Sequence, residues 1–127
     1  MVSMNLSSRE CDGRAVVALR GELDVADAAG VAVALSAVAA RVPELIVDLA
    51  GLEFIDSSGL AALVLARKQA RQAGGDLLLA ALQDQVLRVL AITQLAGVFS
   101  IHASVDQAAG NAGHSSADGP VGGSAIG

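Results

Sequence analysis

The chain has 127 residues, of which 54% are hydrophobic and only 2% aromatic, and its formal net charge is −5. This length fits one domain, and the apolar fraction excludes disorder for the body of the chain. Nucleic acid is not an expected partner, because the net charge opposes the phosphate backbone and aromatic side chains for base stacking are scarce. The single cysteine, Cys11, excludes an internal disulfide, and we interpret it as an incidental thiol.

A membrane-spanning segment is not predicted. The longest uncharged stretch of the apolar region, Ala28 to Ala40, would span about 20 Å as a helix, short of the roughly 30 Å hydrocarbon core. The first nine residues lack the basic segment and following apolar segment of a secretory signal. We therefore expect a cytoplasmic protein that has no membrane partner.

Strand and helix patterns alternate along the body of the chain. Asp12-Gly13 is typical of a hairpin turn, and Asp24 can cap a helix that runs to about Ala40. In the helix that begins near Ser57, we expect Leu60, Leu63 and Val64 to face the core. The apolar patterns predict strands over 4–10, 14–20, 45–49, 77–81 and 98–102, and helices over 24–40, 57–73, 83–93 and from about 104.

This element order predicts an α/β domain. The sheet should be parallel after its first hairpin and covered by helices, because each later strand follows a helix. From Gln107 to Gly127 the chain is rich in Gly, Ser and Ala and shows no apolar period. We therefore expect a domain over residues 1–106 and a flexible tail over 107–127.

The segment from Ile55 to Leu60 is the most informative part of the sequence. With Asp56 as the N-cap of a helix, Ile55 and Leu60 have the spacing of a hydrophobic staple. Ser57 and Ser58 then occupy the first two helical positions, where the positive end of the helix tolerates a phosphate. The hydroxyl of Ser57 should point outward, within reach of another enzyme. The same residues also suit a helix N-terminus that has no further function. The local pattern therefore leaves open whether the segment is a phosphorylation site or only a helix cap.

Several motifs, in order along the chain, resemble the STAS domain, and in particular its single-domain bacterial members, the anti-sigma factor antagonists. The motifs are Gly21-Glu22-Leu23-Asp24, Asp48-Leu49, Phe54-Ile55-Asp56-Ser57-Ser58-Gly59-Leu60, Gly74-Gly75-Asp76-Leu77 and Arg88-Val89-Leu90-Ala91-Ile92-Thr93. The resemblance covers about residues 4–106. It implies the STAS fold, a small mixed β-sheet covered by about four helices.

The resemblance also implies partner switching. In this family an anti-sigma factor with a GHKL-type ATPase fold binds either a sigma factor or the antagonist. The anti-sigma factor is also a serine kinase, and it phosphorylates the first hydroxyl residue of the motif, here Ser57, with Ser58 as the alternative. Phosphorylation releases the antagonist, and a metal-dependent serine phosphatase resets it. By the same resemblance, Asp24, Asp56, Ser57, Ser58 and Gly59 are the expected partner-binding residues.

One departure from the family pattern lies outside the phosphorylation motif. Gln94 stands where many members have a glycine before the following leucine. The tail rich in Gly, Ser and Ala is a second departure. Neither departure touches the residues around Ser57.

Catalysis by the chain itself is not predicted. A serine hydrolase would require G-x-S-x-G, but Ile55 and Asp56 precede Ser57 and Ser58. The only histidines are His102, expected at the surface or at a sheet edge, and His114. No motif for a metal or another cofactor is present. The alternative function is a STAS module that is not phosphorylated and acts as a scaffold or a sensor of a small ligand.

Overall fold

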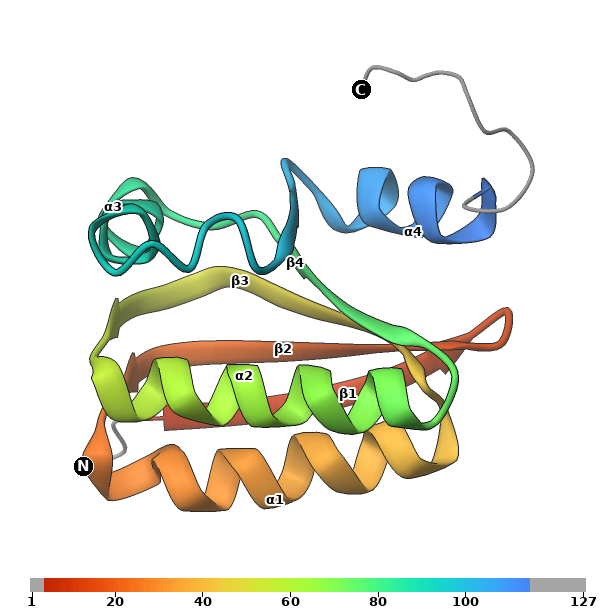
Figure 1. Ribbon diagram of the computed structural model, residues 1–127, viewed down its shortest axis with the longest axis horizontal. Helices are drawn as coiled ribbons and strands as arrows, with labels where there is room; N and C mark the ends of the chain where they lie inside the picture. Colours follow the sequence, from red (N-terminus) through yellow and green to blue (C-terminus); the bar gives the residue numbers. More distant parts are fainter. Residues whose placement is uncertain (1–3, 115–127) are drawn as a thin grey trace.

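The structure is a computed structural model that describes residues 4–114 (Figure 1). Its five strands form one sheet in the order β1-β2-β3-β4-β5. The strands are β1 (Met4–Cys11), β2 (Arg14–Leu23), β3 (Glu44–Ile55), β4 (Asp76–Ala80) and β5 (Ser100–His102). The helices are α1 (Val25–Arg41), α2 (Ser57–Gln72), α3 (Asp84–Ile92) and α4 (Val105–His114). The predicted mixed sheet with four helices is confirmed, because β1 runs antiparallel to β2 and every other neighbouring pair is parallel.

The predicted hairpin turn between β1 and β2 is also confirmed. Both central residues have positive φ, 56° at Asp12 and 79° at Gly13. Such a turn twists in the same sense as its two strands and suits Asp-Gly. It places β1 at one edge of the sheet.

Strand β3 is longer than the sequence predicts. The predicted strand ends at Leu49, but β3 continues to Ile55 and pairs in parallel with β2 until Leu23 faces Ile55. The pairing shifts register twice along β2, between Ala18 and Arg20 and between Gly21 and Glu22. The segment resembles a loop in sequence because polar residues and a glycine interrupt it, yet pairing with β2 holds it extended.

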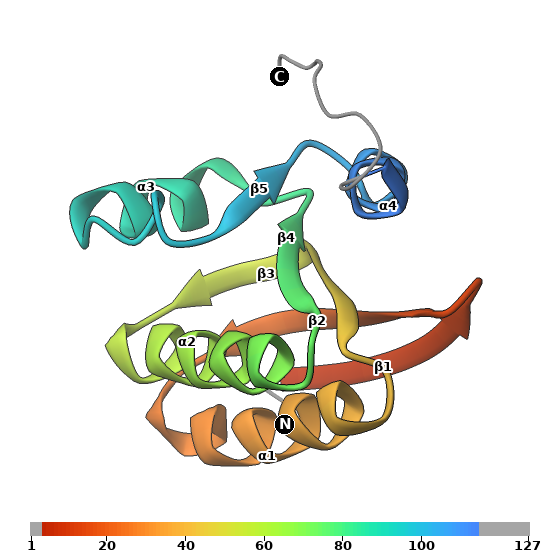
Figure 2. The same ribbon diagram turned by 45° about the vertical axis from the view of Figure 1, so that its right-hand side comes forward.

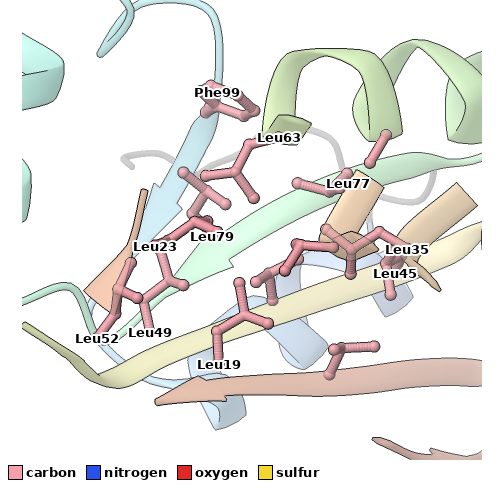
Figure 3. Packing of buried hydrophobic residues seen from close by; sticks show 14 of the residues in the cluster. Leu19, Leu23, Leu35, Leu45, Leu49, Leu52, Leu63, Leu77, Leu79 and Phe99 are labelled. Atoms are coloured by element: carbon pink, nitrogen blue, oxygen red, sulfur yellow. The ribbon is translucent and has the colours of Figure 1, made fainter. Parts of the chain in front are cut away.

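The two faces of the sheet are covered unequally. Helices α1 and α2 lie side by side against one face, and α4 lies against the other (Figures 1 and 2). The larger core is built mainly of leucines from the strands and from α1 and α2, as Figure 3 shows for Leu19, Leu35, Leu49, Leu63 and Leu79. Helix α3 adds Val86 and Leu90 to this core. The aliphatic composition of the chain is therefore used to fill the layer between the sheet and α1–α3.

One residue expected in this core lies outside it. Leu60 and Leu63 are buried as predicted, but 37% of the Val64 surface is exposed. The buried face of α2 continues instead through Ala66 and Ala70. Successive residues of a helix are 100° apart, so Val64 lies on the flank of the face that Leu63 centres.

The last helix crosses the domain boundary that the sequence predicts at residue 106. Ser104 Oγ accepts a hydrogen bond from the Gln107 N–H at 3.1 Å, and Ala108 is fully buried. Ala108 packs on the second face of the sheet against Val16, Ile46 and Leu78. The packed domain thus extends beyond residue 106, because small alanines can fill a shallow interface without a strong apolar period. The rest of the predicted tail, residues 115–127, lies outside the described part of the chain.

Helix α3 ends in a Schellman motif around Gln94. The Leu95 N–H donates to the Leu90 carbonyl at 2.8 Å, and the Gln94 N–H donates to the Ala91 carbonyl at 3.1 Å. Gln94 itself has φ of 64°, the left-handed conformation that this motif requires. A glycine adopts it without steric cost, so the departure from the family pattern falls where glycine is favoured.

Replacing Gln94 with glycine should therefore stabilise the protein. We expect Gln94→Gly to raise the free energy of unfolding by about 1 kcal/mol, because the left-handed strain is relieved. The melting temperature should rise by a few degrees, measured by calorimetry. Gln94→Ala is the matched control and should give no increase, since alanine keeps the Cβ. Equal melting temperatures for Gln94→Gly and Gln94→Ala would show that this strain is not significant.

Helix α4 should contribute strongly to stability. A chain that ends after Ala103 would expose Val16, Ile46 and Leu78, which α4 covers. Relative to a chain that ends at His114, we expect a loss of about 2–4 kcal/mol, measured by urea denaturation. If the two truncated chains unfold at the same urea concentration, α4 is dispensable for the fold.

Candidate functional site: the N-terminus of helix α2

Two helices begin at the edge of the sheet that is formed by the carboxyl ends of its parallel strands, where β2 and β3 end together. Leu23 and Ile55 are paired neighbours at the ends of these strands. The next residues are Asp24, which precedes α1, and Asp56, which precedes α2. The N-termini of both helices consequently lie next to each other (Figure 1, left). The fold thus brings together two acidic residues that are far apart in sequence.

Both carboxylates act as helix N-caps, as the sequence predicts. Asp24 Oδ1 accepts a hydrogen bond from the Ala26 N–H, and Asp56 Oδ1 accepts one from the Gly59 N–H, each at 3.0 Å. Each bond satisfies a backbone donor that the helix leaves unpaired. The geometry supports the interpretation of these acids as capping residues. Each hydrogen bond also holds its carboxylate at the N-terminus of the helix that it caps.

Gly59 is buried and lets α2 approach the end of β2 closely. A Cβ at this position would lie 2.8 Å from both Ile55 Cγ1 and Leu23 Cγ, and 2.9 Å from the Leu23 carbonyl oxygen. The Asp56 N–H also donates to that carbonyl, at 3.2 Å. The role in partner contact that the resemblance implies for Gly59 stays a prediction. Within the fold, the buried Gly59 positions the start of α2.

The two serines differ in accessibility. Ser57, the first residue of α2, is exposed, whereas Ser58 is half-buried. Within residues 4–114, neither of their backbone N–H groups has a hydrogen-bond acceptor. The start of α2 therefore offers an exposed hydroxyl and two backbone donors at the positive end of a helix.

Further acids lie in the segments around this edge of the sheet. Glu22 is the next-to-last residue of β2, Glu53 precedes Asp56 by three residues, and Asp84 begins α3. Two glutamines at the start of α3 connect it to β3. The Gln83 side chain donates to the Ala50 carbonyl at 2.7 Å, and the Gln85 side chain donates to the Glu53 carbonyl at 3.2 Å.

An apolar groove begins at Ser57 and follows α2. It has a volume of about 460 Å³ and ends near Lys68. We call it the α2 groove, and its lining residues are Ser57, Leu60, Ala61, Val64, Leu65, Lys68, Thr93 and Leu95. Sequence reasoning missed it. The sequence feature that could have indicated it is the pair Val64-Leu65. These two large apolar residues lie beside the face of α2 that packs on the core.

The remaining candidates for chemistry lie elsewhere or are not found. His102 lies on the edge strand β5, as expected, with its Nε2 atom 2.8 Å from Ser100 Oγ, and partial burial lowers its pKa. Cys11 is exposed at the end of β1. In the part of the chain that the structure describes, no three His, Cys, Asp or Glu side chains could hold a metal ion together. Across those same residues, no helix has both the length and the apolar character needed to span a membrane.

Comparison with known proteins identifies the family. Residues 5–108 match the STAS domain. The chain is 32% identical over 107 residues to BtrV of Bordetella bronchiseptica, named as an anti-sigma factor antagonist, and the match covers 84% of this chain and 92% of BtrV. The crystal structure of an anti-sigma factor antagonist from Mycobacterium paratuberculosis has a TM-score of 0.78 at 28% identity, over 87% of this chain and 94% of that one.

A more distant structure shares the fold. SpoIIAA of Bacillus, in its phosphorylated form, has a TM-score of 0.64 at 21% identity, over 85% of this chain and 97% of SpoIIAA. The match over residues 5–108, the element order and the two capped helix ends agree with one another. The chain therefore belongs to the STAS domain family, and the relatives named here are anti-sigma factor antagonists.

Proposed function

We propose that this protein is an anti-sigma factor antagonist that works by partner switching in the cytoplasm. In its unphosphorylated form it binds an anti-sigma factor, and the sigma factor is freed. The same anti-sigma factor, a serine kinase of the GHKL-type fold, phosphorylates Ser57, and the complex then dissociates. A metal-dependent serine phosphatase restores the active form. The chain is a regulator and not an enzyme in this scheme, which the names of its relatives support.

The observation that carries this proposal is the exposed hydroxyl of Ser57 at the first position of α2. A kinase must bring this oxygen into line with the terminal phosphate of ATP, which requires an accessible hydroxyl at a fixed position. The Asp56 cap and the packing of Gly59 against Leu23 hold the start of α2 in place. Ser58 has the same side chain but is half-buried, so Ser57 is the better substrate.

A phosphate on Ser57 is compatible with the fold. It adds about −1.5 to −2 charges at neutral pH. The nearby carboxylate of Asp56 repels it, but the helix dipole and the free N–H groups of Ser57 and Ser58 oppose that repulsion. We therefore expect its effect to be confined to the surface around the start of α2.

The same phosphate should weaken the complex. A partner surface that fits a neutral hydroxyl has no counter-charge for it, because its basic groups are already paired with Asp24 and Asp56. Burying an unpaired charge at an interface costs about 2–5 kcal/mol, which corresponds to a loss of about 30-fold or more in affinity. Desolvation at short range, and not unfolding, is the mechanism of release in this proposal.

The second candidate function is a STAS module that is not phosphorylated and senses a small apolar ligand or acts as a scaffold. The α2 groove favours it, since an apolar concavity beside a helix N-terminus can hold a small molecule. The two candidates differ in one measurable respect. Only the partner-switching protein becomes phosphorylated when a kinase and ATP are supplied.

Phosphorylation should occur once, on Ser57. Each GHKL-type anti-sigma kinase of the source genome is purified and incubated with the chain, ATP and magnesium, and the product is mapped by mass spectrometry. With the cognate kinase, Ser57→Ala should remove the modification completely. Ser58→Ala, which changes the neighbouring hydroxyl, is the control and should retain it. A phosphate on Ser58, or none with any of these kinases, would contradict the proposed site.

The charge at Ser57 should control affinity for the anti-sigma factor. We expect Ser57→Asp to bind at least about 30-fold more weakly than the wild type, and Ser57→Ala to bind normally. Titration calorimetry measures both affinities, and circular dichroism checks that the variants are folded. Ser8→Asp adds the same charge to the exposed middle of β1 and should leave affinity unchanged. Wild-type affinity for Ser57→Asp and for the genuine phosphoprotein would support the scaffold function instead.

A further inference from the structure

We propose that the α2 groove binds an amphipathic helix of the anti-sigma factor and supplies affinity that phosphorylation of Ser57 leaves intact. The inference rests on the proposed function, and it divides the contact surface into two parts. The switching part is the start of α2 around Ser57. The anchoring part is the distal half of the groove, around Leu65 and Lys68.

The shape of the groove suits a helix. Along α2 its lining residues recur at Ser57, Ala61, Val64, Leu65 and Lys68, which is the spacing of one stripe on a helix surface. At 1.5 Å per residue this stripe is about 16 Å long, or three turns. A partner helix can place apolar side chains at matching intervals between these residues.

The opposite wall is mainly apolar and is held by hydrogen bonds at the end of α3. Thr93 Oγ1 donates to the Val89 carbonyl at 2.8 Å, which ties the end of α3 to its own last turn. Leu95 is held by its bond to the Leu90 carbonyl and packs against the core. Nearby, 74% of the Ile92 surface is exposed. A preformed apolar wall loses little entropy on binding and therefore favours a protein contact.

Exposed apolar side chains of α2 line one side of the groove. The exposed fraction is 37% for Val64 and 45% for Leu65, although both residues belong to a helix whose other face is fully packed. Water contact with these side chains is unfavourable, and a partner that covers them gains free energy from their burial. The rim is polar at both ends, which is the usual arrangement at a protein interface.

Charge complementarity defines the occupant and its direction. The Ser57 end of the groove adjoins the carboxylates of Asp24 and Asp56, whereas the other end carries the cationic Lys68. A complementary helix has basic residues at the end near Ser57 and an acidic residue at the end near Lys68. A helix with this polarity and an apolar face can bind in one orientation only.

Distance separates the anchoring part from the phosphate. Leu65 follows Ser57 by eight residues, which is about 12 Å along α2. The Debye length is about 8 Å at physiological ionic strength, so the charge of a phosphate is largely screened at Leu65 and beyond. Contacts made there contribute equally to the phosphorylated and unphosphorylated complexes. The phosphorylated chain should thus retain weak binding and not lose it altogether.

The test combines Leu65→Ala with Ser57→Asp. Affinity for the cognate anti-sigma kinase is measured by titration calorimetry, at physiological salt, for each single variant and for the double variant. Leu65→Ala should weaken binding about tenfold in both the wild-type and the Ser57→Asp background. Val33→Ala is the control, because Val33 is also an exposed aliphatic residue of a helix, α1, outside the groove. It should leave affinity unchanged.

The other outcomes each overturn the inference. If Leu65→Ala binds like the wild type, the partner does not occupy the groove. If Leu65→Ala lowers the affinity only in the wild-type background and not in the Ser57→Asp background, the charge at Ser57 acts on the whole contact surface. The absence of measurable binding by Ser57→Asp would show the same. If the wild-type chain binds none of the candidate kinases, the proposed function fails and this inference fails with it. A failure restricted to the Leu65 variant leaves the proposed function intact.

Discussion

The parallel pairing of β2 with β3 up to Leu23 and Ile55 positions the whole of the proposed site. Two helices begin directly after this pair, so their N-termini and their capping carboxylates must lie at the same edge of the sheet. Gly59 makes the arrangement possible, since a side chain there would collide with Leu23 and Ile55. A change in register between these strands would separate Asp24 from Ser57 even if every residue were retained.

In the proposed function, stability and regulation use the same atoms at the start of α2. The Asp56 carboxylate closes the helix through the Gly59 N–H, and this bond leaves the N–H groups of Ser57 and Ser58 free. The residues that stabilise the helix thereby create a place where a phosphate is tolerated by the fold. In the proposed mechanism, partner release depends on the desolvation of that phosphate at an interface, which needs no conformational change within the domain.

Local signals predicted some elements and missed others for identifiable reasons. Asp12-Gly13 and Asp24 act through neighbouring backbone groups, so the turn and the cap could be recognised directly. The end of β3 was missed because pairing with β2 outweighs the low strand propensity of Gly51 and its neighbours. Helix α4 extends through residues that composition alone assigned to the tail, because the buried Ala108 packs on a distant strand surface.

The sequence by itself determined the order of strands and helices, both helix caps and the family. The caps depend on hydrogen bonds between neighbouring residues, and the element order and the family follow from patterns and motifs along the chain. Only the tertiary structure decided that Ser57 is exposed and Ser58 half-buried, and that Gly59 serves packing. It also decided that Val64 and Leu65 line a groove with Thr93 and Leu95. Burial depends on contacts between segments that are far apart in sequence. A local sequence pattern therefore cannot predict which flank of a helix its neighbours leave uncovered.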